Sequence, residues 1–171
     1  RALEEAGIRA DYVTGCSMGA IVGACYCAGV PMEQLHDVAL SLKLSRIAAF
    51  NVNPIRSSGL MRLNKAHKLL EDILGGDKQF SELQTPFSCV ATDLISGKTV
   101  ELKEGSVIDA ALASGTVPGA FSPAEMNGMF LVDGGVLERV PVRELKKMGA
   151  EVIVAVDVLG DCLLYTSPSP R

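Results

Sequence analysis

Short apolar runs alternate with longer segments in which apolar residues recur every three or four positions. The short runs predict β-strands, and the longer segments predict helices that bury one face. Strands are expected at 10–14, 87–94, 98–102, 129–132 and 152–156, and helices at 2–6, 18–28, 32–43, 59–74, 107–113 and 141–148. The run at 152–156 is continuously apolar, which is typical of a strand buried on both faces. Alternating strands and helices predict an α/β domain with a mostly parallel central sheet.

Composition narrows the classes of function. The 171 residues carry a formal net charge of −4 without a basic run, which argues against nucleic acid as a partner. Five cysteines without a C-x-x-C pair, together with two histidines, indicate neither a disulfide framework nor a metal site. No apolar run is long enough to predict a membrane span. We expect a cytoplasmic protein that needs no metal or cofactor, with peripheral contact to a membrane left open.

The sequence Gly15, Cys16, Ser17, Met18, Gly19 lies between a predicted strand and a helix rich in small residues. In that context, Gly-x-Ser-x-Gly indicates a sharp turn that exposes a nucleophilic serine. Gly15 and Gly19 would remove side chains that collide in such a turn, and Ala20 and Gly23 would let the helix approach the sheet. The Met18 backbone N–H would then donate to a developing oxyanion.

Two other interpretations of this segment stay open. Ser17 could be an ordinary N-cap serine in a glycine-rich turn, since serine is a preferred N-cap residue. Cys16 could be proposed as the nucleophile instead. A small apolar role in the interior is the interpretation that we favour for Cys16.

The partner of Ser17 is not expected to be histidine. A Ser–Asp–His triad in the α/β-hydrolase order needs a late histidine, whereas His36 and His67 both lie in the first half of the chain. Asp133 is the best candidate base, because it ends an apolar strand and is followed by Gly134 and Gly135. A plain tight turn is the competing interpretation of Asp-Gly-Gly.

Taken together, these motifs resemble the patatin-like phospholipases, particularly the bacterial members. The resemblance rests on residues 15–20, 90–94 with Gly97, 111–114 with Pro118, Phe121 and Pro123, 132–135, 141–142, 148–150 and 154–157. It implies a three-layer α/β/α fold and a Ser–Asp dyad in which Ser17 is the nucleophile and Asp133 the base. It also implies a hydrolase that cleaves acyl esters of phospholipids, lysophospholipids or neutral lipids through an acyl-enzyme.

Residues 1–160 are expected to form the hydrolase domain, and 161–171, rich in serine and proline, a disordered or non-native tail. The resemblance implies that a first strand and a glycine-rich oxyanion loop precede Arg1 in the intact protein. Hydrolysis is therefore expected of the intact protein and need not be a property of this chain alone. The alternative is a catalytically silent lipid-binding or regulatory domain of the same fold.

Overall fold

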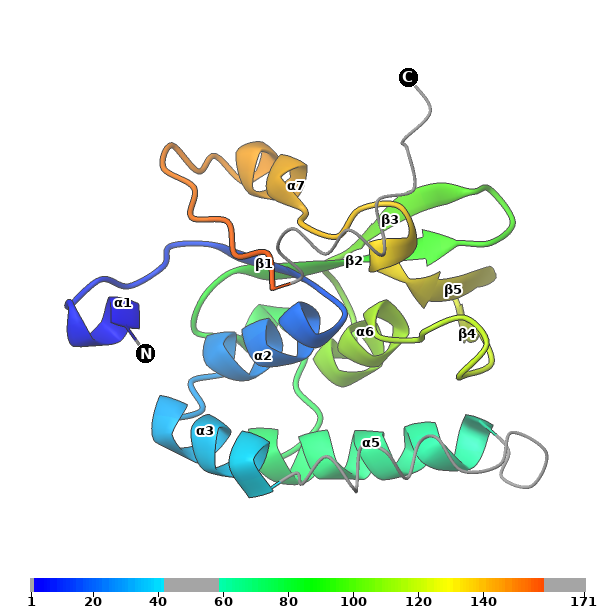
Figure 1. Cartoon of the computed structure of the whole chain (residues 1–171), viewed down its shortest axis with the longest axis horizontal. Helices are drawn as coiled ribbons and strands as arrows, with labels where there is room; N and C mark the ends of the chain where they lie inside the picture. Colours follow the sequence, from blue (N-terminus) through cyan, green and yellow to red (C-terminus); the bar gives the residue numbers. More distant parts are fainter. Residues whose placement is uncertain (1, 42–58, 159–171) are drawn as a thin grey trace.

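The computed structural model describes residues 2–41 and 59–158 as a sheet with helices on both of its faces (Figure 1). The expected tail at 161–171 lies outside these residues. The helices are α1 (Ala2–Glu5), α2 (Met18–Cys27), α3 (Met32–Ser41), α5 (Gly59–Leu74), α6 (Val107–Ser114) and α7 (Val142–Lys147), with single 3-10 turns η2 (Phe80–Glu82) and η3 (Gly134–Val136). The strands are β1 (Val13–Cys16), β2 (Phe87–Asp93), β3 (Lys98–Leu102), β4 (Ala124–Met126) and β5 (Met129–Asp133).

The sheet is organised around β2. On one edge β2 pairs with β3, and on the other it pairs first with β1 and then with β5, whose outer edge carries β4. Only the β1–β2 pair is parallel among the described strands, and the other three pairs are antiparallel. The α/β class is confirmed, but the expectation of a mostly parallel sheet is wrong. Two of the antiparallel pairs are hairpins, β2–β3 and β4–β5, because short connections return the chain beside the strand it has just left.

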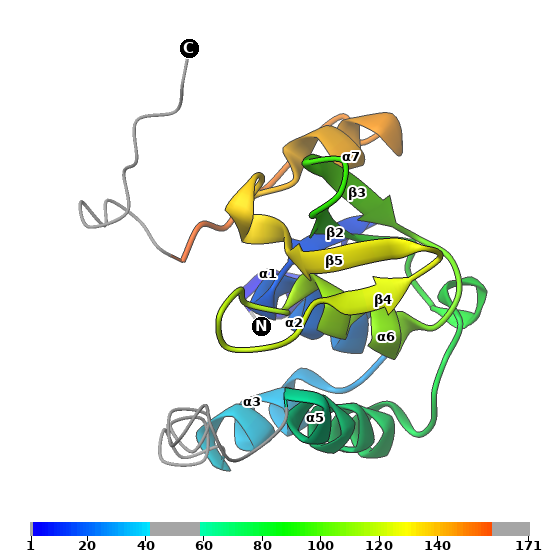
Figure 2. The ribbon, with the colours of Figure 1, turned by 90° about the vertical axis from the view of Figure 1, so that its right-hand side faces the viewer.

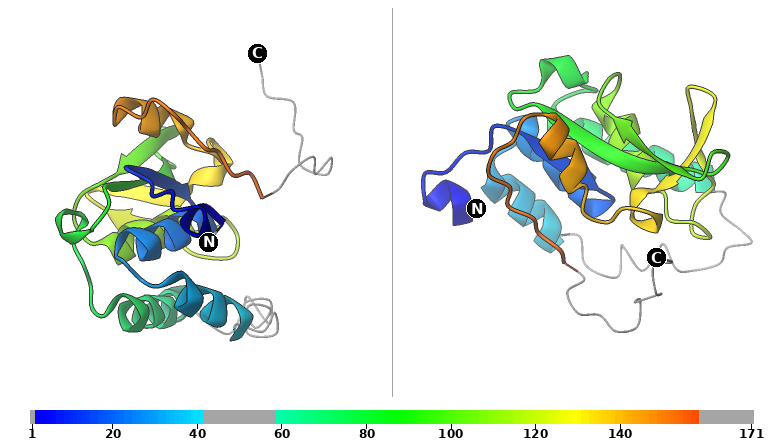
Figure 3. Two further views of the ribbon diagram at one scale, coloured as in Figure 1. Left: turned by 90° about the vertical axis from the view of Figure 1, so that its left-hand side faces the viewer. Right: turned by 90° about the horizontal axis from the view of Figure 1, so that it is seen from above.

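The helices form layers above and below this sheet. α2 and α6 lie side by side against one face, and α7 lies over the opposite face (Figures 1 and 2). α3 and α5 form a further layer outside α2 and α6, as the side view also shows (Figure 3). The expected α/β/α arrangement, a sheet between two helix layers, is therefore present, and α3 and α5 add to it on the side of α2 and α6.

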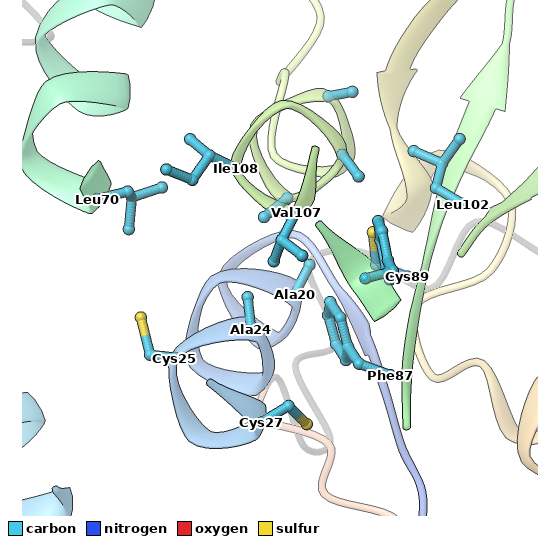
Figure 4. Close-up of a cluster of buried hydrophobic side chains, with 14 of the residues drawn as sticks. Ala20, Ala24, Cys25, Cys27, Leu70, Phe87, Cys89, Leu102, Val107 and Ile108 are labelled. Atoms are coloured by element: carbon cyan, nitrogen blue, oxygen red, sulfur yellow. The ribbon is translucent and has the colours of Figure 1, made fainter. Parts of the chain in front are cut away.

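The main core lies between β2 and the helices α2, α5 and α6 (Figure 4). Ala20 and Ala24 of α2 are buried against the sheet, and Leu70 of α5 approaches Ile108 of α6. A Cβ at Gly23 would lie 2.9 Å from the Phe87 ring, so α2 can pack this closely only with glycine there. The expectation that small residues bring this helix close to the sheet is confirmed.

The helix boundaries follow their capping residues. The predicted helix at 59–74 matches α5, and Gly29 with φ 82° follows the end of α2. At the start of α6, the Ser106 side chain accepts a hydrogen bond of 3.1 Å from the Asp109 N–H. Side-chain chemistry at helix ends is local in sequence, which is why these boundaries can be predicted.

The strand expected at 152–156 does not form. Val152, Val154 and Val156 are 87%, 65% and 75% exposed, and no described strand pairs with them. An apolar run becomes a buried strand only where a neighbouring strand accepts its hydrogen bonds. Among the described residues, no helix is both long enough and apolar enough to span a membrane.

Candidate active site

Ser17 occupies the turn between β1 and α2, in a backbone conformation that is rare for a residue with a side chain. Its φ is 55° and its ψ is −123°, and its side chain makes no capping hydrogen bond to α2. Ser106, in contrast, has extended backbone angles and caps α6 with its hydroxyl. Ser17 therefore differs from an ordinary N-cap serine, and strained backbone of this kind is concentrated at functional sites.

The glycines on either side of Ser17 differ in their surroundings. A Cβ at Gly15 would clash with the Gly19 carbonyl oxygen and would lie 2.6 Å from the Ala20 Cα. Nothing lies within 4 Å of the position of a Cβ at Gly19, and Gly19 is exposed. The turn thus requires glycine before the serine, and the expected collision at Gly19 is absent.

The first amides of α2 point out of the helix beside Ser17. The Ser17 carbonyl accepts hydrogen bonds from the N–H groups of Ala20 (2.9 Å) and Ile21 (3.2 Å), which closes the first turn. Met18 and Gly19 precede that turn, so their N–H groups have no acceptor within the helix. Positive partial charge at a helix N-terminus favours an anion here.

Asp133 is the last residue of β5, and its side chain caps the 3-10 turn that follows. Its carboxyl oxygen Oδ1 accepts a hydrogen bond of 2.8 Å from the Gly135 N–H. The residue is only 8% exposed. A Cβ at Gly134 would clash with the Val90 carbonyl oxygen, so glycine allows η3 to lie directly on β2.

The register of the sheet brings the ends of β1 and β5 together. Cys16 pairs with Val90, and Asp133 pairs with Ala91, the next residue of β2. β1 runs parallel to β2 and β5 antiparallel, on the same edge, so their carboxyl ends face each other. Ser17 and Asp133 therefore lie at one junction, although no hydrogen bond joins their side chains among the described residues.

Cys16 lies between these two residues, and its side chain is directed toward Asp133. Its Sγ donates a long hydrogen bond of 3.9 Å to Asp133 Oδ1, and the residue is half-buried. Burial, and then the negative charge of Asp133, raises the pKa of the Cys16 thiol to about 12. The interpretation of Cys16 as a buried apolar residue is therefore wrong, because its thiol contacts a carboxylate. A thiol with so high a pKa is also a poor nucleophile at neutral pH.

Two residues that the sequence did not mark as functional contact this junction, one at the end of α6 and one just after it. Ser114 Oγ accepts a hydrogen bond of 2.9 Å from the Ser17 N–H, and the Thr116 carbonyl accepts one of 2.8 Å from the Asp133 N–H. The only sequence signal was that Ser114 belongs to the segments that carry the family resemblance. Its contact with Ser17 spans 97 positions and cannot be found from local pattern.

The other titratable candidates have structural partners. His67 Nε2 lies 3.5 Å from Asp109 Oδ1, which links α5 to α6. Asp93 accepts backbone hydrogen bonds from Ile95, Ser96 and Phe130. Asp93 therefore caps the turn between β2 and β3. In the part of the chain that the structure describes, no cluster of His, Cys, Asp or Glu could hold a metal ion.

Comparison with known proteins assigns the family. The patatin-like phospholipase family model matches residues 1–146, and the chain belongs to that family. An NTE family protein of Mycobacterium tuberculosis is 33% identical over 160 residues, which cover 94% of this chain and 44% of that protein. The chain is also similar to lysophospholipase NTE1 of Phaeosphaeria nodorum, at 30% identity over 162 residues that cover 92% of the chain and 11% of that protein. Human patatin-like phospholipase domain-containing protein 6 is 29% identical over 167 residues, or 92% of this chain and 12% of that protein.

The chain thus spans less than half the length of each of these relatives. What they share with it is the segment that contains the Ser17 turn and the β5–η3 junction. The expected resemblance to patatin-like phospholipases is confirmed.

Proposed function

We propose that this chain carries the catalytic centre of a lipid acyl-ester hydrolase that uses Ser17 as nucleophile and Asp133 as base. The observation that carries the proposal is the meeting of β1 and β5 at Val90 and Ala91, which brings both residues to one junction. A serine with strained backbone at a helix N-terminus, with a buried carboxylate at the same junction, supports the assignment of Ser17 as an activated nucleophile.

In the first half of the reaction, Ser17 Oγ attacks the carbonyl carbon of the ester. Asp133 takes the Oγ proton as the new C–O bond forms, and the Met18 N–H donates to the oxyanion that develops. The tetrahedral intermediate then collapses and expels the alcohol, which takes the proton from Asp133. The acyl group remains esterified to Ser17.

In the second half, water replaces the alcohol. Asp133 accepts a proton from the water as its oxygen attacks the acyl carbon, and the Met18 N–H again stabilises the oxyanion. The intermediate releases the fatty acid, and Ser17 Oγ recovers the proton from Asp133.

The relatives and the surface both support a lipid as the substrate. The family is named for phospholipases, and one relative is named a lysophospholipase. Apolar side chains next to the junction are exposed, with Met18 at 63%, Val117 at 45%, Val136 at 55% and Leu137 at 52%. Exposed apolar groups beside a site suit an acyl chain or a membrane surface.

Covalent labelling of the intact protein with a fluorophosphonate tests the proposal. We expect label on Ser17, no label after Ser17→Ala, and a loss of ester turnover of about 10²-fold or more after Asp133→Asn. Asp93→Asn is the matched control, since Asp93 is also a buried aspartate at a strand end (6% exposed), but its carboxylate bonds the N–H groups of its own turn and of Phe130 and lies away from the Ser17 turn. Turnover that survives Asp133→Asn would remove Asp133 from the mechanism. Binding to lipid vesicles with neither labelling nor fatty-acid release would instead indicate the silent lipid-binding domain.

A further inference from the structure

The end of α6 and the two residues after it, residues 114–116, contact the backbone of both proposed catalytic residues. Ser114 and Thr116 are completely buried. Neither has a side chain that reaches a substrate, and the reaction described above uses neither of them. Their hydrogen bonds nevertheless lead to Ser17 and to Asp133.

The Ser114 hydroxyl acts both as a hydrogen-bond donor and as an acceptor. It donates a hydrogen bond of 2.7 Å to the Val90 carbonyl and accepts one of 2.9 Å from the Ser17 N–H. The hydroxyl therefore joins β2 to the strained residue of the turn. A strained conformation persists only where its surroundings fix it, and this bond fixes the peptide plane between Cys16 and Ser17.

The backbone of Thr116 holds Asp133 in a similar way. Its carbonyl accepts the Asp133 N–H at 2.8 Å. Its Oγ1 donates a hydrogen bond of 2.9 Å to the Leu112 carbonyl, which ties the turn to the last residues of α6. One three-residue segment thus holds the backbone N–H groups of both Ser17 and Asp133.

We propose that residues 114–116 position Ser17 against Asp133, with Ser114 as a positioning residue for the hydrolysis. The inference rests on the proposed function, since it presumes that these two residues react together. Loss of the Ser114 hydroxyl leaves the Ser17 N–H without its partner and lets the turn relax. The distance from Ser17 Oγ to Asp133 then changes, while the surface that binds the lipid is left in place.

Ser88 provides a matched control. It is also a fully buried serine, and its Oγ donates a hydrogen bond of 3.2 Å to Thr14 Oγ1 of β1. Ser88→Ala and Ser114→Ala each remove one buried hydroxyl that bonds to the segment around β1. Only Ser114→Ala removes a bond to Ser17.

The experiment compares kcat, KM, the rate of fluorophosphonate labelling and Tm for both variants in the intact protein. We expect Ser114→Ala to lower kcat and the labelling rate by about 10–100-fold, with KM within about twofold, because small misplacements of reacting groups have effects of this size. Ser88→Ala should lower Tm to a similar extent and keep kcat within about twofold of the wild type. A kcat for Ser114→Ala equal to that of Ser88→Ala would overturn the proposal.

Thr116→Val decides the question if Ser114→Ala does not fold. The substitution keeps the volume of the side chain and removes the Oγ1 bond to Leu112, so that the turn loosens without loss of either backbone contact. We expect a drop in kcat of about 10-fold at unchanged KM, and a wild-type kcat would overturn the proposal. A wild-type protein that takes no label on Ser17 would reject the proposed function itself, and this inference with it. Normal labelling in every variant would reject this inference alone.

Discussion

A side chain at Gly15 would meet backbone atoms of Gly19 and Ala20, whereas a side chain at Gly19 would point into open space. We therefore expect Gly15→Ala to lower the free energy of unfolding by about 1–3 kcal/mol, as overpacked substitutions do. Gly19→Ala should change it by less than about 0.5 kcal/mol. Urea unfolding of the two variants measures the difference. Equal stabilities would mean that a Cβ at position 15 does not meet the backbone of Gly19 and Ala20.

The Cys16 thiol lies beside the proposed base with a pKa raised to about 12, so almost no thiolate forms at neutral pH. We expect iodoacetamide at pH 7.5 to leave Cys16 unmodified, as measured by peptide mass spectrometry. Fluorophosphonate labelling of Ser17 should be unaffected by this treatment. Rapid alkylation of Cys16 that blocks labelling would contradict the raised pKa and reopen Cys16 as a reactive group.

Ser17 and Asp133 could be proposed from sequence because each lies within a short motif with a local physical meaning. A glycine two residues before a serine, or two glycines after an aspartate, can be interpreted without knowledge of the rest of the chain. Ser114 could not be found in this way. Its role depends on hydrogen bonds to Val90 and Ser17, 24 and 97 positions away, which only the folded chain creates.

Helices and strands were predictable to different degrees. α5 and α6 were found because apolar spacing and capping residues are local signals. The direction of strand pairing could not be predicted, since an apolar strand has the same pattern in a parallel and an antiparallel pair. β4, with three residues beside the Asn127–Gly128 turn, is too short to show alternation.

The hairpin of β2 and β3 depends on Asp93, whose carboxylate accepts the N–H groups of the turn. Hydrogen bonds from Ser96, together with those from the main chain of Ile95 and Phe130, hold the pKa of Asp93 below its usual value. The carboxylate therefore stabilises the fold fully above the unfolded-state pKa of about 3.9, and this stabilisation is lost as the pH falls through the lower folded-state value.

We accordingly expect the wild type to be more stable than Asp93→Asn at pH 6, with a difference that shrinks between pH 4 and pH 3. Urea unfolding at each pH gives both stabilities, and subtraction removes the titration of the other carboxylates. A difference that stays constant or grows on acidification would show that the charge of Asp93 contributes nothing to the turn.

The whole domain depends on β2. This strand pairs with both β1 and β5, and its side chains form one wall of the core. All seven of its residues are buried, and β3, β1 and β5 together occupy both of its edges. The run at 152–156 is more uniformly apolar than β2, which contains Ser88, Thr92 and Asp93, but its valines are highly exposed. Burial on both faces is thus a property of the position in the sheet, which hydrophobicity alone did not predict.

Hydrogen exchange measures this contrast directly. Amides of β2 have partners on both edges and should exchange only through opening of a large part of the domain, whereas those of 152–156 should exchange within the shortest labelling times. Peptides from β5 should be intermediate, since β5 pairs with only the last three residues of β2 and with the short strand β4. Protection at 152–156 equal to that of β2 would mean that this run pairs with a strand after all, and would restore the buried strand that its sequence predicts.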